Sequence, residues 1–148
     1  MRTALVVEDD EISMRVFEVA LRRRGFRVLQ ARSAQEALDL FRPHPRAFDI
    51  IISDVRLPVT SGPRLAMQLA VVRPRIRVLF SSGTPVEGWE QSDRDCLAQI
   101  KGRVIHGFLA KPFRIETLDA MVDELLKRGR FLHRGSRGRS RELLDSWA

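Results

Sequence analysis

Short apolar runs alternate with segments of helical periodicity along most of the chain. The runs lie at residues 3–7, 26–30, 48–53, 76–82 and 104–110, and each suits one β-strand. The third run, FDIIIS, is almost continuously apolar, as expected for a strand that is covered on both faces. Five strands that alternate with helices predict a doubly wound α/β fold, in which helices cover both faces of a five-stranded parallel sheet.

Between the runs, apolar residues recur every three or four positions, which predicts amphipathic helices. In the first of these helices, the residues expected to face the core are Ile12, Val16, Val19 and Ala20. The weakest helical pattern lies at residues 87–101, where Trp89 and Cys96 share a face that Asp93 interrupts. The boundaries of this helix are therefore the least defined by the pattern.

The net charge of +7 is unevenly distributed over the 148 residues. From Lys127 onward there are seven Lys or Arg and two Asp or Glu, so this end carries +5 and the rest carries +2. We therefore expect a domain at residues 1–127 and a basic C-terminal extension at residues 128–148, either flexible or a short helix. Five net charges without interleaved aromatic residues are a weak signal, so nucleic acid is not an expected partner.

The composition points to a protein of the cytoplasm. No apolar stretch approaches the roughly 20 residues that cross a bilayer, so no membrane association is expected. The N-terminal sequence MRTALVVEDDE becomes acidic too early for a secretory signal. The single cysteine, Cys96, excludes an internal disulfide and suits a reducing compartment.

Polar side chains gather where the predicted strands end. They are Glu8, Asp9 and Asp10 after the first strand, Asp54 after the third, Ser81 and Ser82 at the fourth, and Lys111 after the fifth. The carboxyl ends of parallel strands share one edge of a sheet, so these groups are expected to lie together. Carboxylate oxygens suit Mg²⁺, while a hydroxyl and an ammonium group bind phosphoryl oxygens. The set predicts phosphoryl transfer to a carboxylate.

Four motifs carry a resemblance to a known family. LVVEDDE at 5–11, IISDVRLPVTSG at 51–62, VLFSSG at 78–83 and GFLAKPF at 107–113 occur in that order. Together they resemble the receiver domain of two-component response regulators, over about residues 1–127. The resemblance implies a flavodoxin-like sheet with strand order 2-1-3-4-5.

The resemblance also implies roles for individual residues. Asp54 would be the phosphoacceptor, and Lys111 would pair with it. Asp9 and Asp54 would hold Mg²⁺ directly, Glu8 would act partly through water, and the backbone carbonyl of Arg56 would supply another oxygen.

The resemblance implies further expectations for the switch residues, for the lifetime of the phosphoryl group and for one peptide bond. Ser82 would be the switch hydroxyl, and Phe108 the aromatic ring whose rotamer follows activation. Arg56 and Thr84, each two residues after a key position, would tune the lifetime of the phosphoryl group. The Lys111–Pro112 bond would be cis.

These features predict a phosphorylation-switched signalling receiver. It would take its phosphoryl group from a histidine kinase or a phosphotransfer protein and act through protein contacts, with a homodimer left open. It would be a signalling phosphoacceptor with self-catalysed transfer and slow autodephosphorylation, not a conventional enzyme. Two alternatives are a metal-dependent phosphohydrolase with an aspartyl nucleophile and a DNA-binding regulator that uses the basic tail. The hydrolase would need its nucleophile after the first strand, which VVEDDEIS fits poorly.

Overall fold

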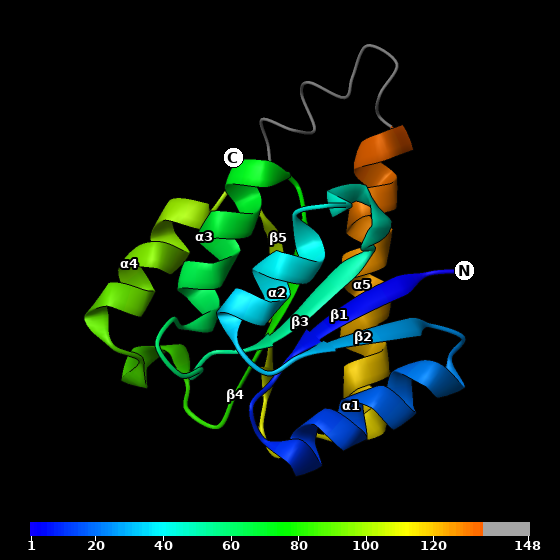
Figure 1. The fold of residues 1–148 in the computed structure, drawn as a ribbon, viewed down its shortest axis with the longest axis horizontal. Coiled ribbons are helices and arrows are strands. Elements are labelled where there is room, and N and C mark those ends of the chain that lie inside the picture. The colour runs from blue at the N-terminus through cyan, green and yellow to red at the C-terminus, as the bar shows by residue number, and fades with distance from the viewer. Residues whose placement is uncertain (135–148) are drawn as a thin grey trace.

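The computed structural model describes the backbone of residues 1–134 and the side chains of residues 1–128. One sheet forms the centre of the described part (Figure 1). Its strands are β1 (Thr3–Val7), β2 (Arg27–Ala31), β3 (Ile50–Asp54), β4 (Arg77–Ser82) and β5 (Ile105–Ala110). All neighbouring strands pair in parallel, in the order β2-β1-β3-β4-β5. The predicted fold class and strand order are confirmed.

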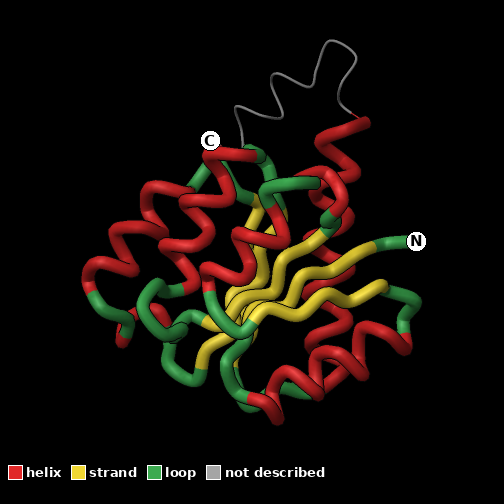
Figure 2. The backbone as a smooth tube through the Cα atoms, in the orientation of Figure 1, coloured by secondary structure: helices red, strands yellow, loops and turns green. Residues whose placement is uncertain are grey.

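Two layers of helices enclose the sheet (Figure 2). The helices are α1 (Glu11–Arg23), α2 (Ala34–Phe41), α3 (Gly62–Val72), α4 (Gln91–Ile100) and α5 (Ile115–Arg134), with short 3₁₀ turns η1 (Pro45–Ala47) and η2 (Val86–Gly88). Helices α2, α3 and α4 cover one face, and α1 and α5 cover the other. In β3, Ile50 and Ile52 pack under α1 and α5, while Ile51 packs on the opposite side. Burial on both faces explains the continuous apolar run.

The buried face of α1 differs from the predicted one. Ile12, Val16 and Val19 are 77%, 38% and 52% exposed, so three of the four predicted core positions were wrong. The buried residues of this helix are Met14, Phe17, Ala20 and Leu21. Both sets have helical spacing, but the second contains larger side chains and removes more apolar surface from water.

The segment after β4 also differs from its prediction. Residues 87–101 were predicted as one helix interrupted by Asp93, whereas the chain forms η2 and then α4. Asp93 is buried and accepts a hydrogen bond of 2.5 Å from the hydroxyl of Ser61, the N-cap residue of α3. The acid therefore links α4 to α3, because a buried carboxylate requires a hydrogen-bond donor.

Helix α5 continues to Arg134, past the predicted domain boundary at residue 127. Most of the predicted basic extension, 128–148, lies outside the described residues. Within residues 1–134, no helix combines the length and the apolar character needed to cross a membrane.

Candidate phosphoacceptor site

Strand register places the predicted acids side by side. Val7 pairs with Ser53 and Asp54 pairs with Ser81, so the ends of β1, β3 and β4 lie at one edge. The amide of Glu8 donates to the carbonyl of Ala31 at 2.9 Å and extends the ladder beyond β1. This backbone contact fixes Glu8 at the edge of the sheet, where its side chain is fully buried.

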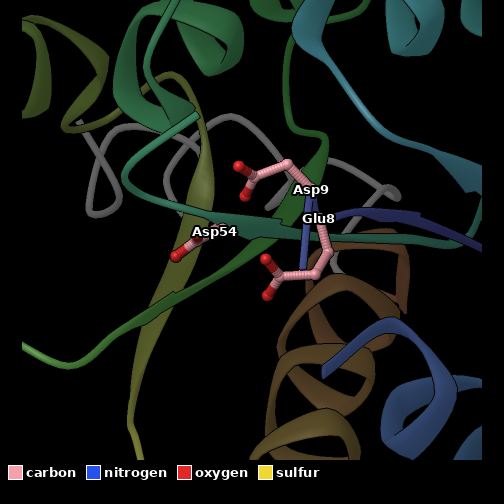
Figure 3. Close-up of side chains that lie close together, drawn as sticks. All are labelled: Glu8, Asp9 and Asp54. Atoms are coloured by element: carbon pink, nitrogen blue, oxygen red, sulfur yellow. The ribbon is translucent and has the colours of Figure 1, made fainter. Parts of the chain in front are cut away.

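Glu8, Asp9 and Asp54 form an acidic cluster (Figure 3). Each offers a carboxylate oxygen, and these oxygens lie within 4.8 Å of one another. The first two residues project from the end of β1 and the third from the end of β3. Three closely spaced carboxylates of graded exposure are a donor set that fits Mg²⁺, which binds oxygen and retains several waters.

Lys111 supplies a cation to the acidic cluster. Its Nζ lies 2.6 Å from Oε1 of Glu8 and 3.7 Å from Oδ1 of Asp54. The lysine follows β5, and its amide donates to the carbonyl of Ser82 at 2.8 Å, next to a cis Lys111–Pro112 bond. The spatial grouping expected from four separate motifs is thus present in the fold.

The surroundings of Asp54 raise its pKa to about 6. Burial is the main cause and the charge of Glu8 is the second, while Lys111 acts in the opposite direction. At pH 7 the carboxyl group is therefore mostly ionised, although burial and the charge of Glu8 make the ionised form less favourable than in water. A bound cation would stabilise the ionised carboxylate and so lower the pKa of Asp54.

Asp10 has a structural role at this edge of the sheet. It is the N-cap residue of α1, and its side chain accepts a hydrogen bond from the amide of Ser13 at 2.8 Å. This bond holds the pKa of Asp10 below its ordinary value. The amide of Asp10 in turn donates to Oε2 of Glu8 at 3.2 Å, so the cap also orients the buried acid.

The hydroxyl of Ser82 is turned toward the loop that follows β4. Its Oγ donates to the carbonyl of Thr84 at 2.9 Å and accepts from the amide of Thr84 at 3.0 Å. Ser82 is buried and Thr84 is half-buried. The predicted switch hydroxyl therefore already has partners, which it would exchange to reach a group on Asp54.

Phe108 stands on β5 with 40% of its surface exposed. Its ring packs against Phe80, Trp89 and His106, with centroid distances of 6.1, 5.8 and 5.5 Å. Burial lowers the pKa of this histidine, which favours the neutral ring. The ring of Phe108 is therefore packed on its inner side and open to solvent on its outer side.

Two residues important for this edge were missed from the sequence. A Cβ atom at Gly62 would lie 2.4 Å from the carbonyl oxygen of Asp54, so only glycine fits there. The other is Trp89, which was read as one position of a weak helix and instead packs beside Phe108. The glycine in the motif TSG was a usable signal, whereas the sequence contained none for the contacts of Trp89.

Arg56 is exposed in the loop after β3.

The fold and this site define a class of protein, the receiver domains of two-component signalling. The sequence matches the response regulator receiver domain family over residues 4–123, and the chain belongs to that family. Similar proteins include the sensor kinase CckA of Brucella abortus (strain 2308), 34% identical over 126 residues, which are 85% of this chain and 13% of the kinase. The two-component response regulator ARR12 of Arabidopsis thaliana is 31% identical over 135 residues, 89% of this chain and 21% of that protein.

A solved structure extends the comparison to the metal. The receiver domain of the sensor histidine kinase PA1611 from Pseudomonas aeruginosa PAO1 has a magnesium ion coordinated in its active site cleft. It is 25% identical, with a TM-score of 0.71, and the match covers 85% of this chain and 98% of that one. The chain spans only about a fifth or less of the two curated relatives. The chain is thus a signalling receiver domain of the two-component type.

Proposed function

We propose that Asp54 is the residue that accepts the phosphoryl group, from a phosphohistidine of a histidine kinase or a phosphotransfer protein. The observation that carries this is the position of Lys111 Nζ, 3.7 Å from Oδ1 of Asp54 and 2.6 Å from Oε1 of Glu8. Among the described residues, this aspartate alone combines partial burial, a raised pKa and a lysine neighbour. The contact lies at β3, which argues against a hydrolase whose nucleophile follows the first strand.

In the proposed transfer, an ionised oxygen of Asp54 attacks phosphorus in line with the bond to the donor histidine. The new O–P bond forms as the N–P bond breaks, and the histidine nitrogen leaves with the electron pair. Lys111 offsets the negative charge on the transferring oxygens. Asp9 and Asp54 would hold Mg²⁺ directly, with Glu8 partly through water and the carbonyl of Arg56 as a further ligand. When bound, the ion would neutralise charge on the phosphoryl oxygens.

After transfer, Ser82 would turn from Thr84 toward a phosphoryl oxygen, and Phe108 would turn inward. This change would bias the surface formed by α4, β5 and α5 between two arrangements. Arg56 and Thr84 would set the lifetime of the phosphoryl group, which ends by slow autodephosphorylation. We also propose a cytoplasmic location and a receiver domain at residues 1–127, followed by a basic extension at residues 128–148.

A protein phosphodonor fits the surface beside Asp54. Helix α1 begins at the same edge of the sheet, directly after the acidic cluster. Its outer side carries the exposed apolar residues Ile12, Val16 and Val19. An apolar stripe next to a charged reaction centre suits a partner that docks by packing and delivers its phosphoryl group to Asp54.

The test is incubation with acetyl phosphate and Mg²⁺, followed by intact-mass measurement. The wild-type chain is expected to gain one labile phosphate, and Asp54→Asn none. Asp39→Asn, at an exposed aspartate on α2, is the matched control and should gain one phosphate. Phosphate uptake by Asp54→Asn, or none by wild type, would refute the assignment.

A further inference from the structure

A pocket of about 210 Å³ lies beside Ser82 and Phe108. Its lining includes Phe80, Ser82, Thr84, Trp89 and Phe108, and we call it the aromatic pocket. Trp89 is only 7% exposed, whereas Phe108 is 40% exposed. The pocket provides space into which the Phe108 ring can turn, and Trp89 forms one of its walls.

The backbone carbonyl of Thr84 accepts two hydrogen bonds in this region. One comes from Oγ of Ser82 at 2.9 Å and the other from Nε1 of Trp89, also at 2.9 Å. A carbonyl oxygen has two lone pairs, so it can accept from both donors at once. One oxygen therefore connects the predicted switch hydroxyl to a buried indole.

Trp89 is also connected to the start of α4. Its amide donates to the carbonyl of Val86 at 3.0 Å and closes η2, and the next residue, Glu90, is the N-cap residue of α4. The indole packs edge-on against Phe80 and Phe108, at centroid distances of 6.2 and 5.8 Å. A displacement of the indole would therefore reach both the pocket and the first turn of α4.

We propose that Trp89 is the positioning residue that carries a change at Ser82 to Phe108 and to α4. This inference rests on the proposed function, because it requires Ser82 to turn toward a phosphoryl group on Asp54. When the hydroxyl turns away, the amide of Thr84 loses its acceptor, while its carbonyl keeps the indole. An unpaired amide is costly, so the loop from Gly83 to Gly88 rearranges and moves the indole with it.

The fluorescence of Trp89 reports this coupling directly. The chain has two tryptophans and no tyrosine, so Trp147→Phe leaves Trp89 as the single emitter. In this background, phosphorylation with acetyl phosphate and Mg²⁺ is expected to change the emission of Trp89. Adding Ser82→Ala should abolish the change when variants are compared at equal phosphate content by intact mass. Adding Ser82→Thr instead, which keeps a hydroxyl at this position, should preserve the change in Trp89 emission.

The outcomes separate the inference from the function on which it rests. Absence of a mass gain in every variant would overturn the proposed function, and the inference with it. A full mass gain with unchanged Trp89 emission would overturn the inference alone. The same is true of an emission change that persists in Ser82→Ala, because the indole would then respond without the hydroxyl.

A second variant tests the indole hydrogen bond itself. Trp89→Phe keeps an aromatic ring and removes the donor to Thr84. Amide exchange in residues 84–93 of the unphosphorylated chain should rise about fivefold, as expected for one lost hydrogen bond. The further change on phosphorylation should shrink. Exchange identical to wild type in both states would show that the indole does not hold the loop, and would overturn the inference.

Discussion

The acidic cluster and the aromatic pocket both lie near the carboxyl ends of the strands, but they are held in different ways. Glu8 is fully buried, its amide extends the sheet ladder, and Lys111 contacts it at 2.6 Å. The pocket depends on a loop in which Ser82 and Trp89 share one carbonyl oxygen, and Phe108 remains 40% exposed. The comparison suggests that the reacting groups are preorganised on strand ends, while the responding groups have exchangeable partners.

The largest expected effect tests the rigidity of the strand end. Gly62→Ala places a methyl group 2.4 Å from the carbonyl oxygen of Asp54, and relief is not easy because this nearest contact is with strand backbone. The free energy of unfolding should fall by about 3 kcal/mol, measured by urea denaturation.

The matched control for this change lies in the loop. A Cβ atom at Gly83 would have nothing within 4 Å, so Gly83→Ala should change stability by less than about 0.5 kcal/mol. Equal losses in the two variants would contradict the proposed difference between strand end and loop.

Removal of the cation tests how the acidic cluster is stabilised. Lys111→Met leaves the fully buried Glu8 without its ion-pair partner, so the free energy of unfolding should fall by about 2 kcal/mol at pH 7. Lys111 is 22% exposed, which reduces the loss relative to a deeply buried pair. The pKa of Asp54 should also rise, since Lys111 lowers it. Lys101→Met, at an exposed lysine, is the control and should be nearly neutral.

The raised pKa of Asp54 predicts a pH dependence of stability. Its pKa is about 6 in the folded chain, against an ordinary value of 3.8, so the folded state binds this proton more tightly. The contribution of Asp54 to stability therefore falls as pH rises from about 4 to about 6, and stays lower above that. Asp54→Asn should raise the free energy of unfolding by about 2 kcal/mol at pH 8 and have little effect at pH 4. A gain that is equal at both pH values would rule out this origin.

The smallest expected effect concerns the loop after β3. Val59 is fully exposed with φ of 69°, a conformation that β-branched residues rarely adopt. Val59→Gly should relieve this strain and raise the free energy of unfolding by about 1 kcal/mol, after the entropy cost of glycine. Val71→Gly, at an exposed valine inside α3, should instead lower stability. Destabilisation by both changes would show that the loop is not strained at Val59.

Much of the fold was predictable because strand burial leaves a strong pattern. The continuous run at β3 requires cover on both faces, and alternation with helices requires parallel strands. The acids and Lys111 could then be grouped, because parallel strands share one carboxyl edge. Local sequence was enough here, since the backbone ladder determines where each strand end lies.

The remaining features depend on tertiary contacts that leave no such pattern. Helix α1 contains two stripes of helical spacing, and side-chain volume decides that Phe17 is buried while Ile12 is exposed. Asp93 looked like an interruption because its donor, Ser61, is 32 residues away. The indole contact of Trp89 with Thr84 likewise depends on the path of a loop, which periodicity does not determine.

The most direct test of the preorganised acidic cluster is the titration of Asp54 itself. ¹³C NMR of its carboxyl carbon, assigned with Asp54→Asn, should give a midpoint of about 6 without Mg²⁺. Saturating Mg²⁺ should lower that midpoint, because a cation among the carboxylates stabilises the ionised form. A midpoint near the ordinary 3.8 that Mg²⁺ does not move would contradict the account, because Asp54 would then be neither buried beside Glu8 nor part of a metal site.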